Sequence, residues 1–197
     1  MTTATQLYLA SQSPRRRELL QQIGIKVRVL VPDVNESALP REAPAEYVER
    51  IARIKAEVEW MTVMERRMKL HPVLAADTAV ILGRRILGKP QNDAEAASML
   101  QSLSGRTHQV ITAVAMAFEG KLKLARSESA VTFRRLAADE IAHYIASGEP
   151  RDKAGAYAIQ GFAAAFISRI EGSYSGVMGL PLFETSRLLK SFGVRVL

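Results

Sequence analysis

The chain has 197 residues, 48% of them hydrophobic, and a formal net charge of +7. This length and composition suffice for a buried core in one domain or in two closely joined lobes. The absence of cysteine excludes a disulfide framework and a thiolate metal site, and the 3 histidines are too far apart in sequence to predict a histidine-rich zinc site. No leader peptide and no apolar run near the ~20 residues of a membrane span are present, so we expect a cytoplasmic protein.

The positive charge suits an anionic partner, such as a nucleic acid, a membrane surface or a phosphorylated metabolite. Aromatic residues make up only 6% of the chain, and no long run of lysine and arginine is interleaved with them. Because nucleic-acid platforms use aromatic side chains for base stacking, these features argue against a nucleic-acid partner.

Hydrophobic periodicity and turn residues predict strands alternating with helices, without an internal repeat or a low-complexity linker. The expected strands are residues 7–10, 27–31, 73–76, a hairpin of 80–82 with 86–87, an antiparallel pair of 110–118 with 122–133, then 157–159, 163–167 and a return to the sheet at 194–197. The expected helices are residues 14–23, 44–68, 93–103 with Asp93 as the cap, 137–147 and 181–192. This order predicts a single unit with a cleft, of the α/β class with a mixed sheet, and not a doubly wound dinucleotide-binding fold.

Three consecutive arginines stand where the first expected helix begins. Ser11 and Ser13 precede Pro14, which favours the first helical position, and Arg15–Arg17 then occupy the first turn. The helix dipole places partial positive charge there and disfavours each cation by roughly 0.3–1 kcal/mol. The arrangement therefore predicts an anion among the arginines, most simply a phosphate.

Asp77 is a carboxylate inside the apolar run from Val73 to Leu82. Burying an unpartnered charge costs several kcal/mol, so Asp77 is expected at a strand end, facing a metal, a water or basic side chains. An Asx turn that caps the strand explains the residue equally well at this point.

Three further charged residues are ambiguous from local sequence alone. Lys89 precedes Pro90, which stops a helix and can aim the lysine into a cleft, although a lone lysine is usually solvated. Lys55 lies within an amphipathic helical pattern and Glu36 in the loop after the second strand, and both have the pattern of surface residues.

The segment from Gly148 to Gly161 combines small residues with Lys153, Tyr157 and Gln160. Glycine and alanine let a backbone approach a flat ligand closely, and the Gln160 amide both donates and accepts, which suits the edge of uracil or thymine. Tight sheet packing is the alternative explanation for these small residues. The glycines and serines of residues 172–181 similarly form either a ligand loop or an ordinary connection.

Several segments, taken together and in this order, resemble the Maf family of nucleoside triphosphate pyrophosphatases. These segments are residues 9–20, 76–78, 87–90, 103–108, 152–157, 160–161, 172–174 and 179–181. The resemblance implies one domain over residues 1–197 and a fold related to the inosine triphosphate pyrophosphatases, with an elongated mixed sheet flanked by helices and two lobes around a cleft. It also implies a homodimer, a divalent cation such as Mg²⁺ or Mn²⁺, and a cytoplasmic location.

The resemblance further implies hydrolysis between the α and β phosphates. Asp77 matches the proton acceptor, and its alternative or additional role as a metal ligand stays open. By the same resemblance the catalytic set is Asp77, Lys89, Lys55 and Glu36; the substrate-binding set is Ser11, Ser13, Arg15, Arg16, Thr78, Lys153 and Gln160; and the metal ligands are Glu36 and Asp77.

Within the family, Arg15, Thr78 and Gln160 match the branch that prefers dTTP and UTP, whereas a sister branch acts on 7-methyl-GTP. Modified pyrimidine triphosphates are further expected substrates, which would give a house-cleaning role, and a link to cell division is known for some relatives. We expect no stable nucleic-acid partner and no membrane association. The alternatives are a nucleotide- or nucleic-acid-binding regulator without turnover and a 7-methyl-GTP pyrophosphatase.

Overall fold

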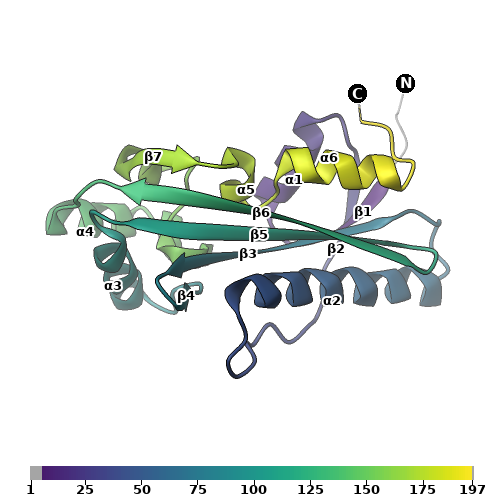
Figure 1. Ribbon diagram of the computed structural model, residues 1–197, viewed down its shortest axis with the longest axis horizontal. Coiled ribbons are helices and arrows are strands. Elements are labelled where there is room, and N and C mark those ends of the chain that lie inside the picture. The colour runs from purple at the N-terminus through teal and green to yellow at the C-terminus, as the bar shows by residue number, and fades with distance from the viewer. Residues whose placement is uncertain (1–5, 197) are drawn as a thin grey trace. The chain divides into compact units, whose positions relative to one another are not determined.

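Seven strands form one mixed sheet in the computed structural model, which describes residues 6–196 (Figure 1). The strand order is β2-β1-β3-β5-β6-β7, and β4 pairs with β3. The pairs β1–β2 and β1–β3 are parallel, whereas β3–β4 and β6–β7 are antiparallel. The strands are β1 Leu7–Ala10, β2 Val27–Leu30, β3 Val73–Leu82, β4 Arg85–Leu87, β5 Thr107–Phe118, β6 Lys121–Phe133 and β7 Ile167–Glu171. The predicted α/β class with a mixed sheet is confirmed.

The part of the chain that the structure describes also contains six α-helices and three short 3-10 helices (η). They are α1 Pro14–Gln22, α2 Pro44–Glu65, α3 Asp93–Leu103, α4 Ala138–Ala146, η1 Glu149–Asp152, η2 Ala154–Ala156, η3 Phe162–Phe166, α5 Tyr174–Met178 and α6 Leu182–Ser191. Within residues 6–196, none of these helices has the length and apolar character that crossing a membrane requires.

The chain divides into two compact units. Unit 1 comprises the described parts of residues 1–77, 112–127 and 179–197, and unit 2 comprises residues 78–111 and 128–178. The strand β3 passes from unit 1 into unit 2 after Asp77. The expectation of one domain over residues 1–197 stays a prediction.

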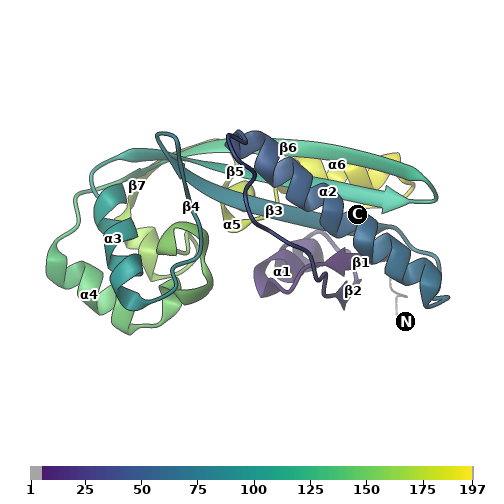
Figure 2. The ribbon, with the colours of Figure 1, turned by 90° about the horizontal axis from the view of Figure 1, so that it is seen from below.

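Unit 1 packs helices on both faces of its strands. Figures 1 and 2 show α2 on one face and α1 and α6 on the other. All four residues of β1 are buried, as expected for a parallel strand that is covered on both sides. The buried face of α2 repeats at helical spacing, with Val48, Ile51, Ala52, Lys55, Ala56, Glu59 and Val63.

Unit 2 is built around an aromatic core. The ring of Phe133 on β6 lies 4.9 Å from the ring of Tyr157 and 6.2 Å from that of Phe166, both in edge-to-face geometry. Tyr144 on α4 contacts Phe166 in the same way at 5.2 Å. Such pairs stabilise beyond their buried area, so they fix α4 and the segment before β7 onto the strands of this unit.

The structure differs from the predicted elements in several places. Residues 73–76 and 80–82 belong to one uninterrupted strand, β3, because Asp77 and its neighbours also adopt the extended conformation. The cap of α3 is Asn92 and not Asp93, since the Asn92 side chain accepts a hydrogen bond from the Glu95 N–H at 2.9 Å. The short helix α5 was not predicted.

The other corrections concern three strands predicted in the last third of the chain. Residues 157–159 form no strand and residues 162–166 form a 3-10 helix, because local bonds satisfy the backbone there: Gly161 N–H donates to Ala158 O and Ala164 N–H to Gly161 O, both at 3.0 Å. The strand β7 starts only at Ile167. Residues 194–196 form no strand, and Leu197 lies outside the described residues.

Candidate active site

The start of α1 places Arg16 against its own unit. Its guanidinium donates from Nη1 to Ser11 Oγ at 3.1 Å and from Nε to the carbonyl of Gly179 at 2.8 Å. Burial lowers the pKa of Arg16, and the charge of Asp77 opposes this decrease. Pro14 takes the first helical position after the N-cap Ser13, as predicted, and the first turn contains no acidic residue. The phosphate expected beside Arg15 and Arg16 stays a prediction.

Lys55 joins the two carboxylates of unit 1 that the sequence analysis selected. Its Nζ lies 2.9 Å from Asp77 Oδ1 and 2.8 Å from Glu36 Oε1. The side chains of Lys55 and Asp77 are 8% and 10% exposed, whereas that of Glu36 is 48% exposed. Two carboxylates therefore meet one ammonium group at a point that is buried on one side and open on the other.

Asp77 lies inside β3 and not at its end, so the predicted strand-end position and the Asx turn are both wrong. Asp77 instead lies close to the carboxyl end of β1. The last residue of β1, Ala10, pairs with Ala75, which is two residues before Asp77 on β3. The chain leaves β1 at Ala10 and enters the turn to α1 through Ser11. Ligands of parallel sheets commonly bind beside such carboxyl ends.

Burial raises the pKa of Asp77, and the cations Lys55 and Arg16 oppose this rise. The carboxylate is consequently a stronger proton acceptor than a solvated aspartate. This is the electrostatic setting that a general base requires.

The surface interpretation of Lys55 is wrong. Lys55 lies four residues after Ile51 and seven after Val48, so all three share the buried face of α2. This spacing relative to apolar residues is the sequence signal that indicates a buried position for Lys55, although lysine is usually exposed.

The loop that carries Glu36 is held by residues that the sequence analysis missed. The Tyr47 hydroxyl donates to the Glu36 carbonyl at 3.0 Å. Arg50 forms a two-pronged ion pair with Glu42, at 2.5 Å and 2.7 Å, and also donates to the Ser37 carbonyl at 3.0 Å. The fork of Arg50 lowers the pKa of Glu42 to about 2. Two side chains of α2 thus fix the backbone on which Glu36 is mounted.

The carboxylate groups of Glu36 and Asp77 are suitable ligands for a hard divalent cation. Both point at Lys55 Nζ, and carboxylate oxygens are the protein ligands that Mg²⁺ prefers. Over residues 6–196, no three histidine, aspartate or glutamate side chains cluster as a complete metal cage. Mg²⁺ sites commonly use only one or two carboxylates and complete the shell with water and substrate phosphate.

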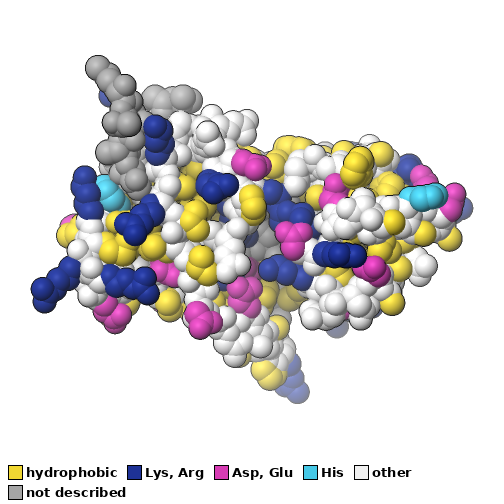
Figure 3. All heavy atoms as spheres, turned by 180° about the vertical axis from the view of Figure 1, so that it is seen from behind, with side chains coloured by type: hydrophobic (Ala, Val, Ile, Leu, Met, Phe, Trp, Pro, Cys, Tyr) yellow, Lys and Arg dark blue, Asp and Glu magenta, His cyan; other side chains and the backbone are white. Residues whose placement is uncertain are grey.

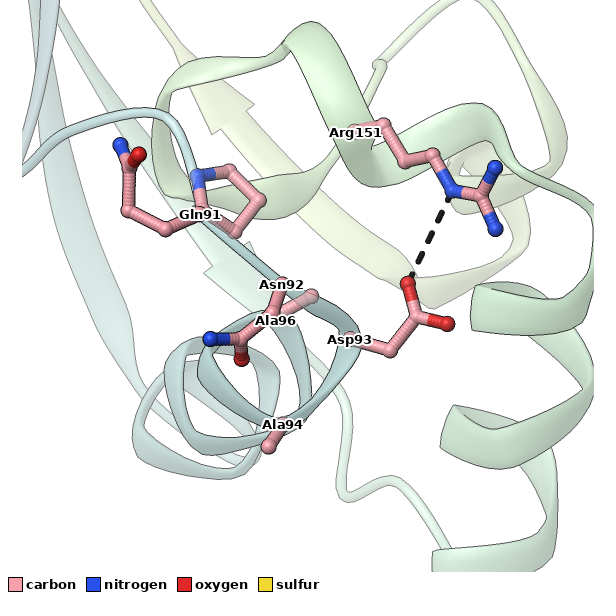
Figure 4. A pocket seen from close by; sticks show the side chains of 7 residues that line it. Gln91, Asn92, Asp93, Ala94, Ala96 and Arg151 are labelled. Carbon is pink, nitrogen blue, oxygen red and sulfur yellow. Dashed lines mark ion pairs between the residues drawn. The ribbon is translucent and has the colours of Figure 1, made fainter.

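The remaining predicted site residues lie in unit 2. Thr78 is partly buried in β3, Lys89 and Gln160 are exposed, and Lys153 forms an ion pair with its neighbour Asp152. A cavity of about 590 Å³ in the same unit is lined by Pro90, Gln91, Asn92, Asp93, Ala94, Ala96 and Arg151 (Figure 4). Across it, Arg151 Nε faces Asp93 Oδ1 at 3.7 Å. None of the lining residues was predicted from the sequence as a site residue.

Unit 2 also contains a buried histidine that the sequence analysis set aside. His108 is 2% exposed, and its Nε2 lies 2.8 Å from the Tyr157 hydroxyl. Burial lowers the pKa of His108 to about 4, so the ring is neutral at physiological pH. The pair holds Tyr157 in place immediately before the segment that carries Gln160.

Figure 3 shows one face of the molecule, on which dark blue basic side chains are interspersed with acidic and hydrophobic ones. A continuous track of lysine and arginine is not visible on this face.

A sequence profile of the family described as Maf-like protein matches residues 6–192. The chain belongs to the Maf family. This confirms the resemblance seen in the sequence.

Curated relatives match the chain over nearly its whole length. A protein of Nitrosomonas europaea is 56% identical over 198 residues, with 96% of each chain covered, and one of Nitrosospira multiformis is 54% identical over the same length and coverage. Each is named dTTP/UTP pyrophosphatase. Among solved structures, the Staphylococcus aureus Ham1 protein superposes with a TM-score of 0.51 at 16% identity, covering 95% of this chain and 97% of that one. This likeness shows that the chain shares the α/β fold of the Ham1 protein.

Proposed function

We propose that this Maf protein is a dTTP/UTP pyrophosphatase, which hydrolyses the triphosphate between its α and β phosphorus atoms to give a nucleoside monophosphate and pyrophosphate. The names of relatives at 50–56% identity support this activity. The observation that carries the chemistry is the meeting of Asp77 and Glu36 at Lys55 Nζ, at 2.9 Å and 2.8 Å.

In the proposed reaction, Asp77 accepts a proton from the attacking water. Its raised pKa suits it to this role, and Lys55 holds the carboxylate in one orientation. Arg15, Arg16, Ser11 and Ser13 bind phosphate oxygens at the start of α1, where backbone N–H groups also favour an anion. Lys55 offsets the negative charge that develops on the leaving pyrophosphate, and Lys89 has the catalytic role that the family resemblance implies.

Glu36 and Asp77 would hold the divalent cation, Mg²⁺ or Mn²⁺. When bound, the cation polarises the phosphate oxygens and offsets their charge. Tyr47 and Arg50 keep Glu36 in place for this role through its backbone.

In unit 2, Gln160 is proposed to recognise the base. Uracil and thymine present an acceptor at O4 and a donor at N3, and one amide can satisfy both. Thr78 and Lys153 have the substrate-binding roles that the family resemblance implies. A homodimer, a cytoplasmic location, a single domain and a house-cleaning role toward modified pyrimidine triphosphates complete the proposal.

Pyrophosphate release across a panel of nucleoside triphosphates, with and without Mg²⁺, tests this function. We expect turnover of dTTP and UTP above all other substrates, and a loss of about 100-fold or more in Asp77→Asn. Asp33→Asn, an exposed aspartate in the loop after β2, is the control and should keep wild-type turnover.

Three outcomes would contradict the proposal. Nucleotide binding without pyrophosphate release would indicate a regulator. Preference for 7-methyl-GTP would overturn the assignment of Gln160. Wild-type turnover in Asp77→Asn would remove Asp77 from the chemistry.

A further inference from the structure

We propose that Tyr144 and Glu149 are positioning residues that set base selectivity, because together they fix the backbone on both sides of Gln160. This inference rests on the proposed function, in which Gln160 recognises the base. All the contacts that support it lie within unit 2.

Tyr144 fixes the backbone before Gln160. Its hydroxyl accepts a hydrogen bond from the Ala158 N–H at 3.1 Å and donates one to Glu149 Oε1 at 2.8 Å. Burial and the neighbouring carboxylate raise the pKa of Tyr144, so the hydroxyl keeps the proton that it donates. The side chain is 4% exposed and its ring packs on Phe166, so it cannot move freely.

Glu149 fixes the backbone after Gln160. Its Oε2 accepts from the Phe162 N–H at 3.0 Å and its Oε1 from the Ala163 N–H at 3.4 Å. These are the first two residues of η3, where a negative charge is favourable. One carboxylate thus binds the tyrosine on one side and the start of a helix on the other.

Between these two anchors the chain makes a tight turn. The Gly161 N–H donates to the Ala158 carbonyl at 3.0 Å, and Gln160 lies inside this turn. A Cβ on Gly161 would overlap the Glu149 carboxylate. The φ of Gly161 is −110°, which any residue adopts, so the close approach of Glu149 and not the backbone conformation requires glycine here.

Gln160 itself is exposed, and over residues 6–196 no hydrogen bond or ion pair holds its side chain. An amide that discriminates uracil from cytosine must present its oxygen and nitrogen at fixed places, since the two bases differ by exchange of a donor and an acceptor. The placement of Gln160 therefore comes from its backbone, which the Tyr144–Glu149 pair holds at residues 158, 162 and 163.

The test is the ratio of kcat/KM for UTP to that for CTP, measured by pyrophosphate release in wild type, Tyr144→Phe, Glu149→Gln and Glu149→Ala. We expect this ratio to fall about tenfold in Tyr144→Phe and Glu149→Ala, with the loss in KM for UTP and kcat nearly unchanged. Glu149→Gln should lose less, because its amide oxygen still accepts one hydrogen bond. A purely structural role would lower the unfolding midpoint and leave the ratio unchanged.

Gly161→Ala gives an independent test of the same contact. It should lower the ratio in the wild-type background and have little further effect in Glu149→Ala, where the overlapping carboxylate is gone. Gly88→Ala is the matched control, because no atom lies within 4 Å of a Cβ at Gly88.

Failure of the proposed function and failure of the positioning role of Tyr144 and Glu149 give different results. A wild-type protein that releases no pyrophosphate from dTTP or UTP contradicts the proposed function. If wild type prefers UTP to CTP and folded Tyr144→Phe and Glu149→Ala keep the same ratio, the pair does not set selectivity. The same conclusion follows if Gly161→Ala lowers the ratio equally in the wild-type and Glu149→Ala backgrounds.

Discussion

The Lys55 cluster of unit 1 and the Gln160 segment of unit 2 are positioned by opposite means. In the Lys55 cluster, charged groups contact one another directly, since Lys55 Nζ meets both Asp77 and Glu36 within 3 Å. In the Gln160 segment, the proposed recognition group carries no charge, and the contacts that hold it are hydrogen bonds to the backbone around it.

This difference bears on how each region tolerates change. Buried charges depend on their partners, because an unpaired charge in a low-dielectric site is strongly unfavourable. Backbone anchors each contribute modestly and can be weakened one at a time. We therefore expect substitutions in the Lys55 cluster to cost both stability and turnover, and substitutions around Gln160 to change selectivity in steps.

The largest effect is expected for Lys55→Met. Removing the ammonium leaves the buried Asp77 carboxylate without its nearest cation, which should lower the unfolding free energy by about 3–5 kcal/mol. Urea unfolding at pH 7 measures this loss. The double variant Lys55→Met, Asp77→Asn should lose less than Lys55→Met alone, and a double variant that is at least as unstable would show that the charge pair is not the cause.

In unit 2, the buried His108 should make the free energy of unfolding depend on pH. Its pKa falls from 6.5 to about 4 in the folded protein, so protonation opposes folding. Stability from this group is complete above pH 6.5 and is lost as the pH falls toward 4, by about 3 kcal/mol in total.

The measurement is urea unfolding of wild type and His108→Gln from pH 7 to pH 4. The glutamine variant should show a shallower decline over this range, because it has no ring to protonate. Parallel curves would mean that His108 titrates normally despite its burial and its contact with Tyr157.

The two regions also differ in how far the sequence predicts them. The parallel strands and long helices of unit 1 were predicted closely, because apolar runs such as residues 7–10 and the 3.6-residue period of α2 are local signals. Residues 157–159 and 163–167 were predicted as strands. Besides the local turn bonds at Gly161 and Ala164, the Glu149 carboxylate and the Tyr144 hydroxyl satisfy backbone groups that a strand would otherwise pair, and no local sequence signal marks these tertiary contacts.

Candidate site residues follow the same division. Asp77 is conspicuous as a charge in an apolar run, whereas Lys55 and Glu36 have unremarkable local sequence and gain meaning only from the fold. Tyr47, Arg50, Tyr144 and Glu149 were missed because their function is to hold other residues, and no sequence pattern marks a hydrogen bond to a distant backbone group.

Arg50→Lys tests whether unit 1 also uses backbone anchors. A lysine cannot reproduce the two-pronged contact with Glu42 or the bond to the Ser37 carbonyl, so the loop carrying Glu36 should loosen. The Mg²⁺ concentration for half-maximal turnover should rise about tenfold. The control is Arg126→Lys, which alters an exposed ion pair between Arg126 on β6 and Glu49 on α2. This variant should change the half-maximal Mg²⁺ concentration little. Equal values for the two variants would contradict a positioning role for Arg50.

The smallest effect on the free energy of unfolding is expected at Glu59. This residue tests whether a buried charge on α2 needs a partner, as Lys55 has. It lies one turn after Lys55 on the buried face of α2, is 4% exposed, and forms no ion pair over the described residues 6–196. Burial raises its pKa, so the folded state favours the protonated form and the ionised carboxylate opposes folding at pH 7.

Glu59→Gln removes that charge and should raise the unfolding free energy by about 1 kcal/mol at pH 7. The advantage should fade as the pH falls through the raised pKa of Glu59 and vanish below the ordinary carboxyl pKa near ~4.3, where wild-type Glu59 is protonated in both states. Glu57→Gln on the exposed face of the same helix should change stability by less than about 0.5 kcal/mol. If Glu59→Gln is less stable than wild type at pH 7, the buried glutamate has a stabilising partner, and α2 then accommodates both of its buried charges by pairing them.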